Sequence, residues 1–512
     1  MSSASVLARE PQISIAWPIN MPCGSPHALK QLLSRAESPP YLAMIMNERT
    51  RGPLNLLSIH HGREIVSLAT PIVMTTLSMT LMWTVDTIFL GHFSSLALGA
   101  AGLGGMLTWA AYSLFNNLSR ISNTFVAQAH GKGDDEAVGH YTWQTVYLSL
   151  VTGALLTVAG YYSYEFLPLI KNPPEVVDAT YVYIRWRTLS AVFTQVLFAL
   201  TGYFQGRRDV RTPMWAGIFA NVLNALLDVW LIFGWSGLAV GGATLLSAPA
   251  MGVKGAAIAT SIGTTVNALI LIVAAVLPRE NRRRYRIHKP RRLDPRAILQ
   301  VVRVGQPSAL EGFVDMSSFA VFTSLIGRAG AVSLAASQIT IQLLSFSFMP
   351  MWGLTTAGSV LTGNEMGARR PQRAASYGRQ VYKLGIYYCL TLLAIYLVAR
   401  GNMFRIFTDD PAVMAFGGSL VVIAAGFQFA DGLRMVGSGI LTGAGDTRPV
   451  MLVTMIIMWG LFLPMTWYLI GQRGGNVTTA WLGGSVCYLL QAVALWGRFQ
   501  SGRWQKVRIF HR

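Results

Sequence analysis

The stretch Trp83-Thr84-Val85-Asp86-Thr87-Ile88-Phe89-Leu90-Gly91 places one carboxylate inside an apolar run that begins near Ile65. A run of about 25 such residues can cross a bilayer as a tilted helix. An aspartate there costs on the order of 3 kcal/mol, so it needs a compensating use. Further polar side chains recur deep in two later apolar runs: Asn221, Asn224 and Asp228 in one, Gln428 and Asp431 in the other. This pattern predicts a membrane transporter whose helices bring these groups together.

The composition is that of a polytopic membrane protein. Of the 512 residues, 52% are hydrophobic and 12% charged, with a mean hydropathy of +0.44. A formal charge of +19 would suit nucleic acid, but nearly all of it lies in short links between apolar runs. That is how cytoplasmic loops face anionic lipid. The three cysteines offer no CxxC metal spacing. We therefore expect a lipid bilayer as partner, no nucleic acid and no cofactor.

The apolar runs predict an all-α integral membrane protein with about twelve transmembrane helices. An even number also keeps both termini on one side. The expected segments lie near 64–90, 97–128, 140–168, 176–205, 212–235, 252–278, 298–327, 333–363, 379–400, 411–441, 449–471 and 478–498.

Basic residues gather in alternate links. The longest, 279–297, is dense in arginine, and links near 206–211 and 369–373 and the tail 501–512 are also basic. The opposite set of links carries only scattered charges. The positive-inside rule therefore predicts that both termini and 279–297 are cytoplasmic. We expect the plasma (inner) membrane as the location.

The chain repeats itself at a fixed offset. Pro71 and Pro307 are 236 positions apart, as are Gly131 and Gly367, and the Gly206-Arg-Arg-Asp209 and Gly443-Ala-Gly-Asp446 motifs are 237 apart. These offsets predict two six-helix lobes of the same orientation. We expect an N-lobe at 59–278, a basic linker at 279–297, a C-lobe at 298–500 and a basic tail at 501–512.

The first residues differ from the rest. Residues 1–58 are rich in Ser, Pro and Arg and lack a helix-length apolar run or a secretory cleavage pattern. They predict a disordered or non-native extension, with Met44 or Met46 as alternative starts. A chain that begins at Met46 is expected to insert and transport normally.

The carboxylates of the first half suit cation binding. Asn224 and Asp228 are one helical turn apart and share a face. A carboxylate buried among amides with no fixed cation is competent to take up a proton, and the same oxygens can coordinate Na⁺. Asp86, Asn224 and Asp228 are therefore a candidate Na⁺ or H⁺ site, and the sequence leaves the ion open. The alternative is a polar packing contact between helices.

The second half offers weaker candidates. Glu311 and Asp315 are one turn apart on the seventh segment, and Glu311 lies near enough to the helix start to be a membrane-edge residue. Asp431 precedes Arg434 by three residues, so this pair can be a neutral structural unit.

At these residues the chain resembles the multidrug and toxic compound extrusion (MATE) family over about 60–500. The matching motifs occur in order and in both halves: 85–88, 206–213, 221–234, 252–260, 305–307, 428–431 and 443–447. The resemblance implies twelve helices in two lobes and antiport of organic cations against Na⁺ or H⁺.

The resemblance also assigns roles to residues. Asp86, Asn224 and Asp228, with Thr260, match the family's N-lobe cation-site pattern. Asp315 and Asp431 match C-lobe acidic positions of one subgroup, which usually has Glu at position 315 and a Tyr at position 427. This chain has Asp315 and Phe427 there, and these departures favour the N-lobe as the coupling site.

The leading hypothesis is a secondary antiporter, expected to be monomeric, that exports amphipathic and often cationic compounds by alternating access. The runner-up is a lipid-linked saccharide flippase of related architecture, which an extended cationic cavity would support. A membrane-embedded enzyme such as a prenyl transferase would need paired Asp-rich metal motifs. Asn224 and Asp228 alone do not supply them, so we expect no enzyme activity.

Overall fold

The computed structural model describes residues 61–170, 172–234, 238–240, 243–245, 249–327, 331–406, 411–472 and 477–510. The predictions for residues 1–58, including the alternative starts, lie outside these ranges. The described part is almost entirely helical, which confirms the all-α fold class. One short antiparallel hairpin, β1 (Leu238–Val240) with β2 (Ala243–Leu245), follows the fifth segment.

The first half of the chain forms the helices that were predicted up to residue 278, and the basic link adds one short helix. Their bounds are α3 Gly62–Phe93, α4 Ser95–Arg120, α5 Ser122–Lys132, α6 Asp135–Tyr161, the 3₁₀ turns η1 Tyr162–Glu165 and η2 Leu167–Ile170, α7 Pro174–Thr188, α8 Ala191–Gly206, α9 Arg211–Phe233, α10 Val253–Val276 and α11 Arg279–Arg284.

The second half follows the same order. Its elements are α12 Pro295–Gly327, α13 Ala331–Gly367, α14 Pro371–Met403, the 3₁₀ turn η3 Phe404–Ile406, α15 Pro411–Ala444, α16 Thr447–Ile457, the π-helical turns η4 Met458–Phe462 and η5 Tyr468–Gln472 on either side of α17 Leu463–Trp467, α18 Val477–Gln500 and the 3₁₀ turn η6 Arg503–Lys506.

Ten helices within the described ranges are long and apolar enough to cross a membrane. The other two predicted segments are the 37-residue α13 and the pair α7 and α8. This pair is one predicted span, near 176–205, that the structure breaks at Leu189 and Ser190. The Thr188 hydroxyl donates to the Ile184 carbonyl and the Ser190 hydroxyl to the Arg187 carbonyl. Such back-bonding competes with the helical ladder and bends helices.

Local sequence sets the tight turns between helices. Ser94 ends α3 and caps α4, because its hydroxyl accepts a hydrogen bond from the Ala97 amide at 3.0 Å. Gly133 has a φ of 75° after α5, a conformation that glycine adopts without steric cost. The next residue, Asp134, caps α6 through the Ala137 amide.

Many large apolar side chains are exposed along the helices. Val398 is 88% exposed and Met106 71%. Apolar surface of this extent is rare on a water-soluble monomer and suits a hydrocarbon solvent. Together with the spans, it makes the chain an integral membrane protein.

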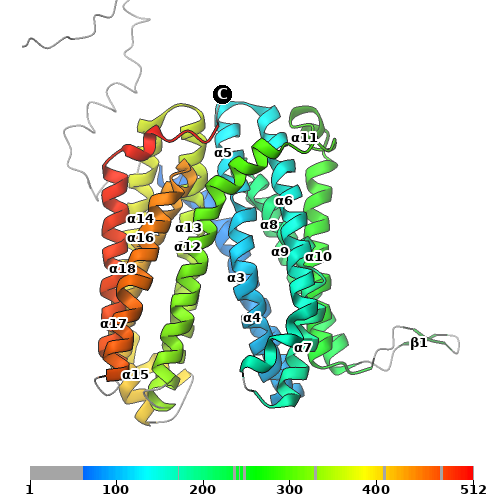
Figure 1. Ribbon diagram of the computed structural model, residues 1–512, viewed down its shortest axis with the longest axis vertical. Coiled ribbons are helices and arrows are strands. Elements are labelled where there is room, and N and C mark those ends of the chain that lie inside the picture. Colours follow the sequence, from blue (N-terminus) through cyan, green and yellow to red (C-terminus); the bar gives the residue numbers. More distant parts are fainter. Residues whose placement is uncertain are drawn as a thin grey trace, which may run out of the picture. The chain divides into compact units, whose positions relative to one another are not determined.

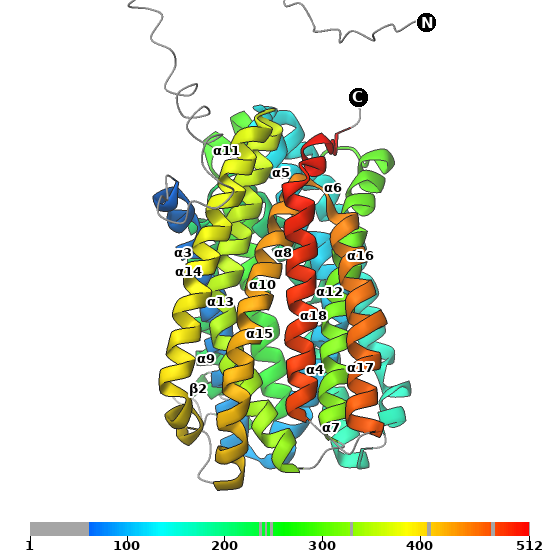
Figure 2. The same ribbon diagram turned by 90° about the vertical axis from the view of Figure 1, so that its left-hand side faces the viewer.

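The helices alternate in direction, so links of one kind meet at one end. Figure 1 shows α11 and the C-terminal end of the chain, in red, at the same end of the bundle. Figure 2 shows the long helices α13, α14, α15 and α18 running side by side. We call the end that carries α11 the basic end. The lobe and linker boundaries expected from the sequence remain predictions.

Candidate functional site

Asp86 of α3 meets two other helices of the first half. The Thr260 hydroxyl of α10 donates to Asp86 Oδ2 at 3.4 Å. Asp228 of α9 lies close enough to Asp86 for the two carboxyl groups to interact directly. Asn224 lies one turn before Asp228, and both side chains are 0% exposed. The structure therefore gathers the four residues expected in the N-terminal half.

The polar atoms of this cluster are poorly satisfied. Among the described residues, no hydrogen-bond partner reaches Asp86 Oδ1, either Asp228 carboxylate oxygen, or the side-chain oxygen and nitrogen of Asn224. Two buried carboxylates this close repel each other when both are charged. The arrangement therefore calls for a proton on one of them or for a shared cation. Carboxylate, amide and hydroxyl oxygens are the ligands that hard cations take, so the residues fit Na⁺ as well as H⁺.

Two neighbours on α7 were missed from the sequence. Arg187 and Tyr183 both lie within electrostatic reach of Asp86, although neither makes an ion pair or hydrogen bond with it among the described residues. Arg187 donates to the Ser190 hydroxyl at 2.8 Å. The sequence could have indicated Arg187, because an arginine inside an apolar segment is itself a candidate functional residue.

In the second half, Arg434 gathers all three acidic candidates. Its Nε donates to Asp431 Oδ1 at 2.8 Å and Nη2 to Asp315 Oδ2 at 3.3 Å, while Nη1 lies 3.9 Å from Glu311 Oε1. The Arg434 side chain is 6% exposed. The expected pairing of Asp431 with Arg434 is present, but the same guanidinium also joins Asp315 and Glu311 on α12.

Two more hydroxyl groups complete this cluster. The Ser438 hydroxyl donates to Glu311 Oε1 at 2.9 Å, and the Tyr488 hydroxyl of α18 donates to Asp315 Oδ1 at 3.1 Å. Phe427 packs on Tyr488 with ring centroids 4.5 Å apart. A phenol thus reaches these carboxylates from α18, although position 427 lacks one. Glu311 lines a cavity between the helices, and its position relative to the membrane edge remains a prediction.

That cavity lies where the two halves of the chain meet. It has a volume of about 210 Å³ and is walled by α4, α5 and α8 of the first half and by α12, α13 and α15 of the second. Its charged lining residues are Arg120, Glu311, Asp315 and Arg434. Arg120 was not a candidate from the sequence, although an arginine in an apolar run is again the signal. Asp86 and Asp228 do not line this cavity.

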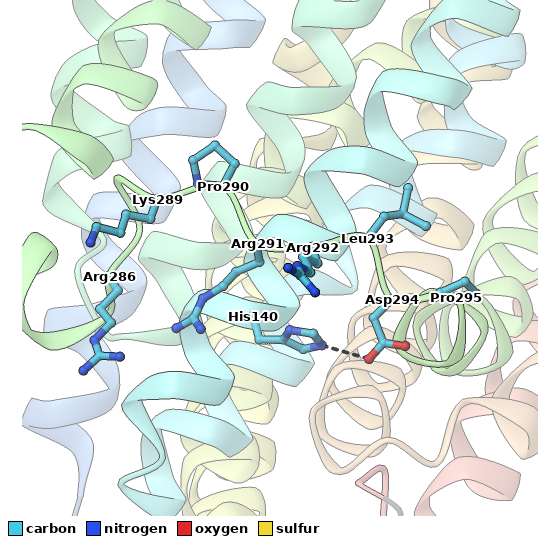
Figure 3. Close-up of a pocket in the computed structure, with 9 residues that line it drawn as sticks. All are labelled: His140, Arg286, Lys289, Pro290, Arg291, Arg292, Leu293, Asp294 and Pro295. Atoms are coloured by element: carbon cyan, nitrogen blue, oxygen red, sulfur yellow. Dashed lines mark ion pairs between the residues drawn. The ribbon is translucent and has the colours of Figure 1, made fainter.

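A second, larger hollow lies in the basic link. It has a volume of about 880 Å³ and is lined by His140 and residues of 286–295. Figure 3 shows the side chains of Arg286, Lys289, Arg291 and Arg292 around it and the ion pair between His140 and Asp294, whose charged atoms are 3.4 Å apart. It contains none of the expected site residues, so its position ties it to the link rather than to the buried carboxylates.

At the basic end the two halves are joined by a matched set of contacts. The Gln128 side chain donates to the Gly443 carbonyl, and the Asn364 side chain donates to the Gly206 carbonyl, both at 3.1 Å. Gln128 and Asn364 are 236 positions apart, and Gly206 and Gly443 are 237 apart. Each half therefore presents a side-chain amide at the equivalent position to a glycine carbonyl of the other half, as the repeat in the sequence predicts.

Comparison with known proteins identifies the fold and the family. The sequence profile of the MatE family matches residues 71–230 and 307–468, two stretches whose starts are again 236 apart. The probable multidrug resistance protein NorM of Thermotoga maritima is 29% identical over 451 residues, which cover 88% of this chain and 94% of that protein. The multidrug resistance protein PmpM of Pseudomonas aeruginosa is 29% identical over 409 residues, covering 79% of this chain and 83% of PmpM.

Comparison with solved structures gives the same fold. An outward-facing multidrug resistance MATE transporter of the MOP superfamily superposes with a TM-score of 0.75 at 21% identity, over 86% of this chain and 96% of that one. The eukaryotic MATE transporter AtDTX14 gives 0.74 at 18% identity, over 87% and 96%. The family match and the relatives define a membrane transporter with internal repeats, not an enzyme. The chain belongs to the MatE family.

Proposed function

We propose that this chain is a secondary antiporter that exports amphipathic organic compounds in exchange for Na⁺ or H⁺. The observation that carries the proposal is the Asp86–Asp228 pair, two neighbouring carboxyl groups with three oxygens that meet no hydrogen-bond partner among the described residues. Such a pair binds a cation or a proton, because it is unstable with two bare charges. The relatives NorM and PmpM are multidrug resistance proteins by name, which supports drug-like compounds as the cargo.

The proposed mechanism is alternating access between the two halves, with the protein acting as a monomer. The cavity of about 210 Å³ is smaller than the roughly 300–1,000 Å³ typical of drug-binding pockets. A substrate therefore needs the halves to separate, and the contacts at the basic end are the ones that break or form. An ion at Asp86 and a substrate in the cavity each bias this equilibrium by their different affinity for its two states.

We place the basic end in the cytoplasm of the plasma (inner) membrane, with both termini on that side, from the charge of its links. A cysteine introduced at Arg283 of α11 should not react with a membrane-impermeant maleimide added outside intact cells. It should react after the cells are opened. Labelling in intact cells would reverse the topology.

The experiment for the proposed function is transport by purified protein in sealed vesicles. Uptake or release of the cation ethidium is followed under an imposed Na⁺ gradient, an imposed pH gradient, and neither. Antiport predicts movement of ethidium against its own gradient with one of the two ions. Equal rates in all three conditions would refute coupling.

The flippase alternative gains no support from the cavity. A flippase was expected to have an extended cationic cavity, whereas the lining of this cavity contains Glu311 and Asp315 as well as Arg120 and Arg434. Arg434 is moreover held by three carboxylates.

A further inference from the structure

The central cavity contains two arginines in opposite circumstances. Arg434 contacts the carboxylates of Glu311, Asp315 and Asp431. Arg120, at the last residue of α4, has no hydrogen bond or ion pair with any of the described residues. Its guanidinium instead lies 4.8 Å from the ring centroid of Trp352 and 5.7 Å from that of Phe198. The same cavity therefore contains one arginine that is paired with carboxylates, Arg434, and one that has no anionic partner among the described residues, Arg120.

Arg120 is half-buried and lies inside the helix bundle rather than on its outer surface. It lines the interior cavity and is followed by Ile121 and then by the 11 residues of α5. At about 1.5 Å per residue, its Cα lies roughly 18 Å from the end of α5 at Lys132. A charge at that depth is costly unless it has a partner or a function. Stacking on two aromatic rings offsets part of the cost but leaves the five N–H groups of the guanidinium without acceptors among the described residues.

Nearby polar atoms are also without partners. Asn123 Oδ1, Ser308 Oγ and Thr355 Oγ1 line the same cavity, are buried, and meet no hydrogen-bond partner within the described part of the chain. Asn123 is only 9% exposed. Two of these groups are hydroxyls, which can donate to an anion. The cavity that contains Arg120 therefore offers unpaired polar groups, as a binding site does and packed helix surface does not.

The opposite wall has the opposite charge. Three carboxylates surround the single cation of Arg434, so this cluster carries an excess of negative charge when its acids are ionised. Of the three, Asp315 is the most accessible, with 27% of its side chain exposed, against 13% for Glu311 and 5% for Asp431. The cavity is bipolar, with an open cation on the first half and accessible carboxylates on the second.

We infer that Arg120 binds the carboxylate of the transported compound, so that the substrates are zwitterionic aromatic amphipaths. The carboxylate takes the planar fork of the guanidinium in a bidentate pair. The aromatic body stacks on Trp352 and on Phe348, whose rings lie 6.0 Å apart. The substrate's cationic group faces Asp315 and Glu311. This inference rests on the proposed export function and specifies its substrate class.

The test uses two forms of one dye. Rhodamine B carries a free carboxylate and is zwitterionic, whereas its methyl ester has the same ring system and only the positive charge. Binding of each to the purified full-length protein is measured by fluorescence anisotropy, without any ion gradient. The wild type should bind rhodamine B more tightly than the ester. Equal binding, tighter binding of the ester, or no binding of rhodamine B overturns the inference.

Variants locate the effect. Arg120→Gln should weaken binding of rhodamine B by at least about tenfold and binding of the ester by less than about twofold, as expected for one charged hydrogen-bonding partner. Arg120→Lys keeps the charge but loses the fork, so it should retain part of the preference for the acid. Arg303→Gln removes an exposed arginine outside the cavity and is the matched control. Equal loss of both dyes in Arg120→Gln would show a structural role and refute the assignment.

The results of these binding experiments can be distinguished from a failure of the proposed transport function. A wild type that prefers rhodamine B, but shows no gradient-driven movement of any dye, supports the Arg120 site and refutes antiport. A wild type that pumps ethidium but prefers the ester refutes only the Arg120 site.

Discussion

Gly131 packs so closely against Asn364 that a methyl group at position 131 would overlap the Asn364 carbonyl oxygen. The repeat produces the same contact in reverse, because a methyl group on Gly367 would overlap the carbonyl oxygen of Gln128. These two glycines let α5 and α13 cross backbone to backbone at the basic end. The closure of this end therefore depends on two missing side chains.

Gly131→Ala should accordingly separate the halves at the basic end, and Gly367→Ala should do the same. A Cβ has no room beside a backbone carbonyl, so the helices must move apart. The measurement is the distance between spin labels at Lys132 and Arg370, both at exposed positions near the crossing. Both variants should shift the distribution to longer distances. Gly102→Ala is the control, since nothing lies within 4 Å of a Cβ there. An unchanged distribution in both crossing variants would contradict the interpretation.

Asp86→Asn is expected to abolish ion-driven efflux while insertion and expression stay near wild type. The amide keeps the shape and the bond from Thr260, but it cannot exchange a proton and is a poorer cation ligand. Asp228→Asn should behave alike, and the double variant should be little worse than either single one, because the two carboxyls serve one site. The measure is the initial efflux rate under an imposed gradient, per amount of protein in the membrane.

The C-terminal cluster provides the counter-test for that assignment. Asp431→Asn should have a milder effect, since Arg434 already neutralises Asp431. Full gradient-driven efflux by Asp86→Asn, together with an inactive Asp431→Asn, would move the coupling site to the second half.

Arg434→Gln should lower stability by roughly 3–5 kcal/mol, because it leaves the buried Asp431 and the partly buried Asp315 and Glu311 without their shared cation. Tyr488→Phe removes one hydroxyl donor from Asp315 and should cost only about 1 kcal/mol. Both stability losses are measured by heating the protein and following the monodisperse peak in size-exclusion chromatography. The temperature at which half of the peak is lost is compared between each variant and the wild type. Arg303→Gln, at an exposed position, should melt like the wild type. A melt of Arg434→Gln that matches this control would show that the cluster does not stabilise the fold.

The turn between α5 and α6 should respond to acid. The Lys132 ammonium donates a hydrogen bond to Asp134 at 2.8 Å and lowers the pKa of that carboxyl below its ordinary value of 3.8. A lowered pKa stabilises the folded turn above about pH 4, and this stabilisation is lost as the pH falls through the folded-state value. Asp134 is partly exposed, so screening by solvent keeps the effect within about 1 kcal/mol.

Asp134→Asn isolates that charge because the amide oxygen can still cap α6. Hydrogen exchange in the first turn of α6, corrected for its intrinsic pH dependence, should be faster in the variant at neutral pH and should converge on wild type as the pH falls through the lowered pKa of Asp134. Glu175→Gln, at an exposed site on α7, should change nothing in α6. A difference between Asp134→Asn and wild type that persists at low pH would assign the effect to the cap rather than to the charge.

Much of the architecture could be read from the sequence, because the bilayer imposes local rules. Apolar runs long enough to span it, basic links on one side and a fixed offset between repeated motifs are all properties of short segments. They predicted the twelve segments and the internal repeat. Neighbours on one helix, such as Asp431 and Arg434 or Asn224 and Asp228, were also accessible, since three or four residues make one turn.

Tertiary structure alone decided which charges meet across helices. Asp315 is 119 residues from Arg434 and 173 from Tyr488, and the rotation of α12, α15 and α18 about their axes sets those contacts. Sequence showed arginines within apolar runs but could not show that Arg434 holds three carboxylates while Arg120 holds none. The reason is physical: hydrophobic burial fixes which residues enter the membrane, whereas packing between helices fixes each buried charge's partner.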